Sequence, residues 1–76
     1  MNIEEHKAIV QAVYPNCKCH TRSESMGEWY MIFPENVDPN TTSEKAIEYS
    51  FTSEEQCWYR AARTILHNMV TKLESA

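Results

Sequence analysis

Thiol and imidazole groups are the side chains of this sequence best suited to metal binding or nucleophilic catalysis. The chain contains Cys17, Cys19, Cys57, His6, His20 and His67. A structural zinc ion is bound by four cysteine or histidine side chains in a tetrahedron, so the chain contains enough of these residues for one zinc site. However, Cys17 and Cys19 lack the Cys-x-x-Cys spacing of the common zinc knuckle, and on a strand His20 would point away from both sulfurs. We therefore expect no metal and no cofactor, and we expect the cysteines to be small core residues, with a zinc-binding module as an alternative.

Nucleophilic catalysis by cysteine requires a histidine beside the thiol and a third group that orients that histidine. Cys19 and His20 are adjacent and would face apart on a strand, while Cys57 and His67 are too far apart on one expected helix to meet. The paired carboxylates at positions 54–55 begin that helix, where the helix dipole accounts for them. A chain with a single glycine also has no glycine-rich phosphate loop. The sequence therefore predicts a protein that is not an enzyme.

Length and charge restrict the class of protein further. The 76 residues suffice for a single domain, 1–76, and 42% of them are hydrophobic, too many for an intrinsically disordered chain. Seven Lys and Arg against eleven Asp and Glu give a net charge of −4, which disfavours direct binding to nucleic acid. The sequence shows neither an apolar run of membrane-spanning length nor the pattern of a signal peptide. We expect a cytoplasmic protein with reduced thiols and no membrane contact.

Apolar periodicity predicts two helices and three strands in the order α-β-β-β-α. The expected helices span residues 3–14 and 54 to about 74, and the expected strands span 17–23, 29–33 and 46–51. Strands that follow one another so closely form an antiparallel meander, and two amphipathic helices then cover one of its faces. The predicted fold class is α+β, a two-layer sandwich whose second sheet face is open to water or to a partner.

The last helix has the clearest pattern, because its apolar residues recur at three- and four-residue spacing. Its stripe comprises Trp58, Ala61, Ala62, Ile65, Leu66, Met69 and Leu73. Either Ser53, through Gln56, or Thr52, through Glu55, is expected to cap this helix, and Asn2 is expected to cap the first helix. Tyr59 lies off the stripe, where it could serve as an exposed anchor for a partner.

The open sheet face and the loop at 34–45 are the expected binding surfaces. If the helices cover the side of Trp29, Met31 and Phe33, the open face carries Lys18, His20, Arg22, Tyr30, Ile32 and Glu48. Ile47, Tyr49 and Phe51 are expected to share one face of the third strand. Tyrosine and arginine are enriched at interface hot spots, so His20, Arg22, Tyr30 and Tyr59 are candidate contacts. Glu35, Asp38 and Glu44 in the loop could meet a basic groove of a partner.

The α-β-β-β-α order resembles that of the double-stranded RNA-binding domain, over most of the chain. In that family a lysine-rich stretch at the start of the last helix grips phosphates across the major groove. The matching positions here, 53–56, read Ser-Glu-Glu-Gln, and Arg60 and Arg63 lie deeper in the helix. The resemblance implies an RNA-binding module only as an alternative, because the phosphate-gripping positions are acidic.

Size, charge and layout also resemble those of small acidic proteins encoded by phages and prophages, including anti-CRISPR inhibitors. The run 51–58 leading into Ala61 and Ala62 is similar in style to small phage α/β sandwiches. The resemblance implies a protein that occupies a surface on a larger nuclease or DNA-binding complex, with acidic groups in place of DNA phosphates. We therefore expect a protein-binding inhibitor of a host nucleic-acid-acting complex. A small homodimeric regulatory or structural protein is the alternative.

Overall fold

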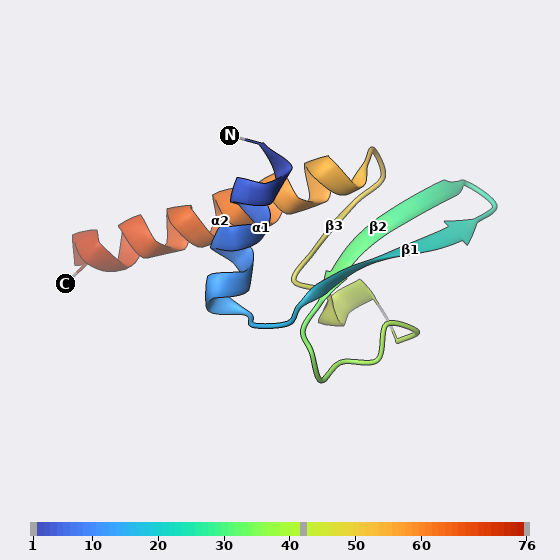
Figure 1. Cartoon of the computed structure of the whole chain (residues 1–76), viewed down its shortest axis with the longest axis horizontal. Helices are drawn as coiled ribbons and strands as arrows, with labels where there is room; N and C mark the ends of the chain where they lie inside the picture. Colours follow the sequence, from blue (N-terminus) through green and yellow to red (C-terminus); the bar gives the residue numbers. More distant parts are fainter. Residues whose placement is uncertain (1, 42, 76) are drawn as a thin grey trace.

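The computed structural model of the chain describes residues 2–41 and 43–75. Its elements follow the order α-β-β-β-α, which confirms the predicted α+β class (Figure 1). They are helix α1 (Ile3–Val13), strands β1 (Lys18–Glu24) and β2 (Gly27–Phe33), the 3-10 turn η1 (Ser43–Lys45), strand β3 (Glu48–Ser50) and helix α2 (Glu54–Ser75).

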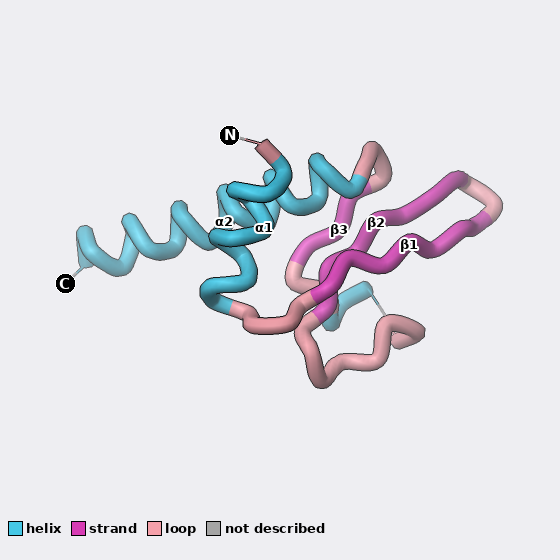
Figure 2. Tube along the Cα trace, viewed as in Figure 1, coloured by secondary structure: helices cyan, strands magenta, loops and turns pink. Residues whose placement is uncertain are grey.

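The three strands form one antiparallel sheet in the order β1-β2-β3. Strands β1 and β2 are joined by a tight turn, and Gly27 leaves that turn with a φ of 126°, a conformation that side-chain-bearing residues rarely adopt. This hairpin projects away from both helices in Figure 2. Strand β3 is shorter than the predicted strand over 46–51, and it pairs only with the second half of β2.

Both helices begin at the predicted caps. The backbone N–H of Glu5 donates to Oδ1 of Asn2 (3.0 Å), and the N–H of Gln56 donates to Oγ of Ser53 (3.1 Å). Each bond satisfies one of the amide donors that the first turn of a helix leaves unpaired. The cap predicted at Asn2 is therefore confirmed, and of the two predicted alternatives for the last helix, Ser53 rather than Thr52 forms the cap.

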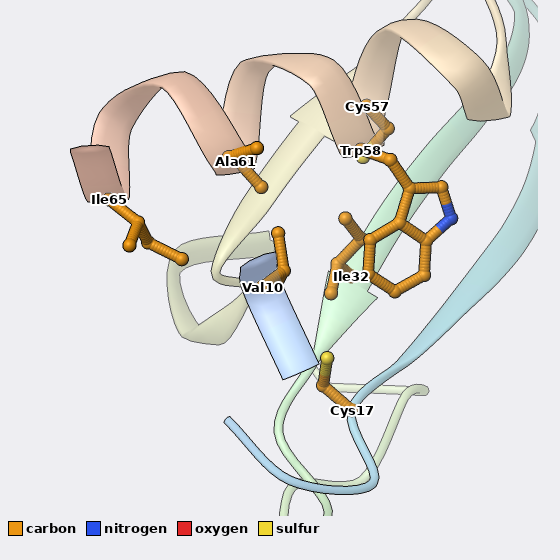
Figure 3. Packing of buried hydrophobic residues seen from close by; sticks show 8 residues of the cluster. Val10, Cys17, Ile32, Cys57, Trp58, Ala61 and Ile65 are labelled. Carbon is orange, nitrogen blue, oxygen red and sulfur yellow. The ribbon is translucent and has the colours of Figure 1, made fainter. Parts of the chain in front are cut away.

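Helix α2 packs against β2 and β3, and α1 packs across α2 on the same side of the sheet. The core between them consists of Val10, Cys17, Ile32, Cys57, Trp58, Ala61, Ala62 and Ile65. In Figure 3 the indole of Trp58 lies beside Ile32, with Cys17 at the lower edge of the cluster. Cys17 and Cys57 are fully buried and Cys19 packs against the cluster, so the prediction that the cysteines are core residues is confirmed.

The predicted assignment of the two sheet faces is wrong. Residues directly opposite each other on antiparallel strands share a face, and the register pairs Lys18 with Phe33 and Cys19 with Ile32. Because Ile32 belongs to the core under the helices, the helices cover the side of Tyr30 and Ile32. The other face carries Trp29, Met31 and Phe33 together with Lys18, His20 and Arg22. Strand β2 is apolar on both faces, so its own alternation could not decide which face meets the helices.

The second sheet face is also less open than predicted. Met31 and Phe33 are each only 1% exposed, although they point away from the helices. The loop between β2 and β3 is tied to this face by Arg22, whose Nη2 donates to the carbonyl oxygens of Pro39 (2.8 Å) and Thr41 (2.9 Å). One half of the face is therefore closed by the loop, and the other half is exposed.

Helix α2 is twice as long as α1, with 22 residues against 11, and it runs well past α1 in Figure 1. Its apolar stripe is therefore buried only in its first half. Leu66, Met69 and Leu73, which the stripe predicts to share the core face, are exposed. Within the described residues, no helix is both long and apolar enough to cross a membrane.

Candidate protein-binding surface

Three aromatic side chains, Trp29, Tyr49 and Phe51, gather on the sheet face opposite the helices; we call them the aromatic cluster. The ring centroids lie 4.6 Å apart for Trp29 and Phe51, 5.9 Å for Tyr49 and Phe51, and 6.1 Å for Trp29 and Tyr49. The ring of Phe51 meets each of the other two edge-on, which is a favourable aromatic geometry. Tyr49 is nevertheless 40% exposed and Phe51 60% exposed. The cluster is thus ordered internally and accessible to a partner.

The strands that hold the aromatic cluster explain how it forms. Tyr49 on β3 lies opposite Met31 on β2, so its ring points to the same side as Trp29, two residues earlier on β2. Phe51 follows β3 directly and turns its ring toward Trp29. The predicted sharing of a face by Tyr49 and Phe51 was the signal that could have found the cluster. It was missed because Trp29 was assigned to the helix-covered side, and because Ile47 in fact packs against the core.

The acidic residues of the loop, Glu35, Asp38 and Glu44, are all exposed. Oδ1 of Asp38 accepts a hydrogen bond from the backbone N–H of Asn40 (2.9 Å), which shapes the loop at this point. Arg22 ties the 39–41 segment to the sheet face that carries the aromatic cluster, and Arg22 lies opposite Trp29 in the register. The loop that carries these carboxylates is therefore anchored beside the aromatic cluster.

Arg22 and His20 lie on this same face, but their side chains have partners within the chain. Both hydrogen bonds of the Arg22 guanidinium go to loop carbonyls. The imidazole of His20 is half-buried, with its centroid 5.9 Å from that of the Phe33 ring. His20 also lines a polar hollow of about 510 Å³ together with Asn16, Lys18, Phe33, Pro34, Glu35, Val37 and Pro39. Arg22 therefore holds the loop against the sheet, and the His20 ring packs beside Phe33, so neither side chain is fully available to a partner.

Tyr30 and Tyr59 lie apart from the other predicted contacts. Tyr30 is on the helix-covered side of β2, and its hydroxyl donates to Oε2 of Glu28 (3.1 Å). The neighbouring Glu28 carboxylate raises the pKa of the Tyr30 hydroxyl, because it accepts this bond from the neutral phenol and repels the phenolate. Tyr59 is on α2, with its ring 5.3 Å from that of His6. The seven predicted contacts therefore do not form one surface, and only five of them belong to the loop or its sheet face.

Cys19 and Cys57 both lie on the helix-covered side of the sheet. The Cys57 thiol, on the first turn of α2, lies within hydrogen-bond distance of the carbonyl oxygens of Tyr30 (3.3 Å) and Glu48 (3.6 Å). The influence of the Cys57 thiol lowers the pKa of Cys19, whereas Cys19 and burial raise the pKa of Cys57. His20 lies on the opposite sheet face from Cys19, so it is not placed to act as a base for that thiol.

Metal ligands do not gather in the part of the chain that the structure describes. Within residues 2–41 and 43–75, no group of three or more His, Cys, Asp or Glu side chains is arranged to hold a metal ion. Comparisons with protein-family models, with curated proteins and with solved structures find no match to this chain. The surfaces described above are therefore the basis for assigning a function.

Proposed function

We propose that this chain is a non-enzymatic protein-binding module that docks its aromatic cluster onto a larger protein. The observation that carries the proposal is a group of three mutually contacting rings on the sheet face opposite the helices, of which Tyr49 and Phe51 are exposed and Trp29 is half-buried. Aromatic residues are enriched at the centres of protein interfaces, and contiguous exposed apolar patches on small proteins mark interaction sites. A partner would bury the edges of Tyr49 and Phe51 that water now contacts.

The acidic loop beside the cluster suggests the charge of the partner. Glu35, Asp38 and Glu44 contribute to a net charge of −4, and such groups attract a basic surface and speed association with it. Proteins that act on nucleic acids carry basic grooves for phosphates, and carboxylates can occupy such grooves. In its specific form, the proposal is a phage- or prophage-type inhibitor that blocks a host nucleic-acid-acting complex.

The test is a tagged pull-down from nuclease-treated bacterial lysate, read by mass spectrometry. Wild-type protein is compared with Phe51→Ser in the aromatic cluster and with Leu73→Ser, a matched apolar-to-polar change at a 79% exposed position on α2. We expect one stoichiometric partner that wild type and Leu73→Ser retain and Phe51→Ser loses. A partner retained equally by Phe51→Ser would overturn the role of the cluster. A partner that disappears with nuclease treatment would indicate binding to nucleic acid instead.

Charge reversal tests the acidic loop separately. Replacing Glu35, Asp38 and Glu44 with Lys should weaken binding and reduce its dependence on salt, because attraction between exposed charges is screened by ions. Unchanged affinity and salt dependence in this triple variant would show that the loop carboxylates do not contribute to binding. The aromatic cluster would then remain as the docking site.

The far half of α2 favours a second candidate, a small homodimeric protein. Leu66, Met69, Val70 and Leu73 are exposed along the second half of α2. A chain of this size buries only a small apolar core of its own. Pairing two copies along these residues would bury further apolar surface and so stabilise both copies. The solution mass of the purified protein separates the candidates. A dimer that Leu73→Asp dissociates supports self-association, and a monomeric wild type contradicts it.

A further inference from the structure

Strand β1 is one edge of the sheet, and its outer side carries backbone groups without a partner. The carbonyl oxygen of Ile32 accepts from the N–H of Ile47 (2.7 Å), so the backbone of Ile32 points toward β3 and that of Met31 points toward β1. Met31 lies opposite His20, so every second residue of β1, counted from His20, bonds to β2. The residues between them turn their N–H and C=O groups outward, and in the described part of the chain no other segment bonds to these groups. They are Cys19, Thr21 and Ser23.

The other edge of the sheet is closed. Strand β3 has three residues, and Tyr49 is the one whose backbone points outward, because it lies opposite Met31. Its N–H already donates to Oε1 of Glu48 (3.0 Å). A long and regular edge with unpaired amides is a template for another strand, whereas a short edge with a bonded amide is not. Strand β1 spans seven residues without a proline or a bulge, so it is the edge that is able to pair.

We propose that β1 pairs antiparallel with β1 of a second copy of this chain, in a register centred on Thr21. Thr21 then lies opposite Thr21 of the second copy, and Cys19 lies opposite Ser23 of the second copy. In these pairs the outward N–H and C=O groups of the two strands face each other, so each pair exchanges two backbone hydrogen bonds. The two sheets would join into one continuous sheet across a two-fold axis.

The charges at the two ends of β1 favour a second copy as the occupant of this edge. In the proposed register, Lys18 lies directly opposite Glu24 of the second copy, and the same pair occurs again at the other end. Both pairs are of the non-hydrogen-bonded type, in which the side chains lie closest together. Lys18 and Glu24 are exposed, and neither belongs to an ion pair within residues 2–41 and 43–75. A strand without this spacing of charges would not make both contacts.

The rest of the molecule leaves room for this pairing. The hairpin of β1 and β2 projects away from both helices, so the second copy would meet β1 outside the helical layer (Figure 2). His20 would lie opposite Arg22 of the second copy, with little repulsion because the Arg22 guanidinium is bound to loop carbonyls. Since the two-fold axis is perpendicular to the sheet, both aromatic clusters would lie on the same side of the joined sheet. The dimer does not depend on what the clusters bind, so it is tested without any partner protein.

The test exchanges the charges at the two ends of β1 and follows self-association by sedimentation velocity at protein concentrations up to about 1 mM. Wild type should pass from monomer to dimer as its concentration rises. Lys18→Glu alone and Glu24→Lys alone each place like charges opposite each other at both ends, and each should weaken dimerisation at least about tenfold. Mixing these two variants restores opposite charges at both ends, so they should form a heterodimer. The double variant, Lys18→Glu with Glu24→Lys, should dimerise like wild type.

Two further variants separate the β1 edge from the rest of the surface. Thr21→Pro removes an outward N–H at the centre of the proposed pairing, and proline is tolerated on an edge strand where the N–H faces water. This variant should remain folded by circular dichroism and should lose the dimer. Leu73→Asp, at a 79% exposed position on α2, is the control and should keep it.

Three results would overturn the proposal. The first is a wild-type protein that stays monomeric at about 1 mM. The second is a dimer that Thr21→Pro and both single charge variants leave unchanged, and its dissociation by Leu73→Asp would show pairing along α2 instead. The third is a dimer that Thr21→Pro dissociates but that neither the mixture nor the double variant restores, which would exclude the register centred on Thr21.

Discussion

The two faces of the sheet meet their surroundings in different ways. On the helix side, Ile32 lies under Trp58 and joins the core shared by α1 and α2. On the opposite side, Met31 and Phe33 are buried beside a loop, while Tyr49 and Phe51 are exposed and Trp29 is half-buried. Regular elements cover the first face only in the half from which the hairpin does not project, and the second face is covered only as far as the loop extends. An apolar face that is covered in part keeps its remaining aromatic surface available for another molecule.

The largest effect on stability should come from the helix-side face. Trp58→Ala removes the largest fully buried side chain of the core and leaves a cavity, which should cost about 3–5 kcal/mol. A domain of this size has a total stability of similar magnitude, so the variant should be largely unfolded at room temperature. Urea denaturation followed by circular dichroism measures the loss. A cooperative transition with a loss below about 1 kcal/mol would contradict the account of this face.

A smaller effect is expected where the loop closes the opposite face. Arg22→Ala removes both hydrogen bonds to the carbonyl oxygens of Pro39 and Thr41 and should cost about 1–3 kcal/mol. The same change should speed amide hydrogen exchange over 34–41, because the loop loses its attachment. Arg63→Ala, at an exposed arginine on α2, is the control and should change stability by less than about 0.5 kcal/mol. Equal effects of the two variants would show that Arg22 does not hold the loop.

The stability of the core on the helix side of the sheet should also depend on alkaline pH, through the buried thiol of Cys17. Burial raises the pKa of the Cys17 thiol above its ordinary value of 9.0, so above that pH the unfolded chain loses a proton that the folded chain keeps. The stabilisation present below pH 9.0 should therefore decline as pH rises further, by up to about 1.4 kcal/mol per pH unit. Urea denaturation between pH 8 and 10 should show a shallower decline for Cys17→Ala than for wild type. Parallel curves would contradict the burial of an un-ionised thiol.

Much of the architecture could be predicted because local patterns specify it. Asn2 and Ser53 cap the helices as expected, and the cysteines are core residues as their small apolar character predicts. The assignment of sheet faces failed because residues 29–33 are apolar on both sides of the strand. Charge on the neighbouring strand holds the missing information, since Lys18, His20 and Arg22 share one face and cross-strand pairing places that face opposite the helices.

The candidate surface was harder to predict than the fold. Arg22 was expected to contact a partner, but it binds loop carbonyls that are distant in sequence and whose position no local pattern encodes. Tyr49 and Phe51 were expected to share a face, but their contact with Trp29 depends on the register between β2 and β3. The apolar stripe runs along the whole of α2, but α1 is half as long as α2 and cannot cover all of it. The sequence pattern of α2 alone therefore does not show which of its apolar residues remain exposed.

The central claim, that the aromatic cluster binds a partner, is tested most directly by affinity measured on the captured partner. Phe51→Ser changes a 60% exposed side chain and should alter the free energy of unfolding by less than about 1 kcal/mol. If the ring is an interface hot spot, the same change should weaken binding at least about 30-fold in titration calorimetry, while Leu73→Ser should leave the dissociation constant unchanged. A folded Phe51→Ser protein that binds with wild-type affinity would contradict the account.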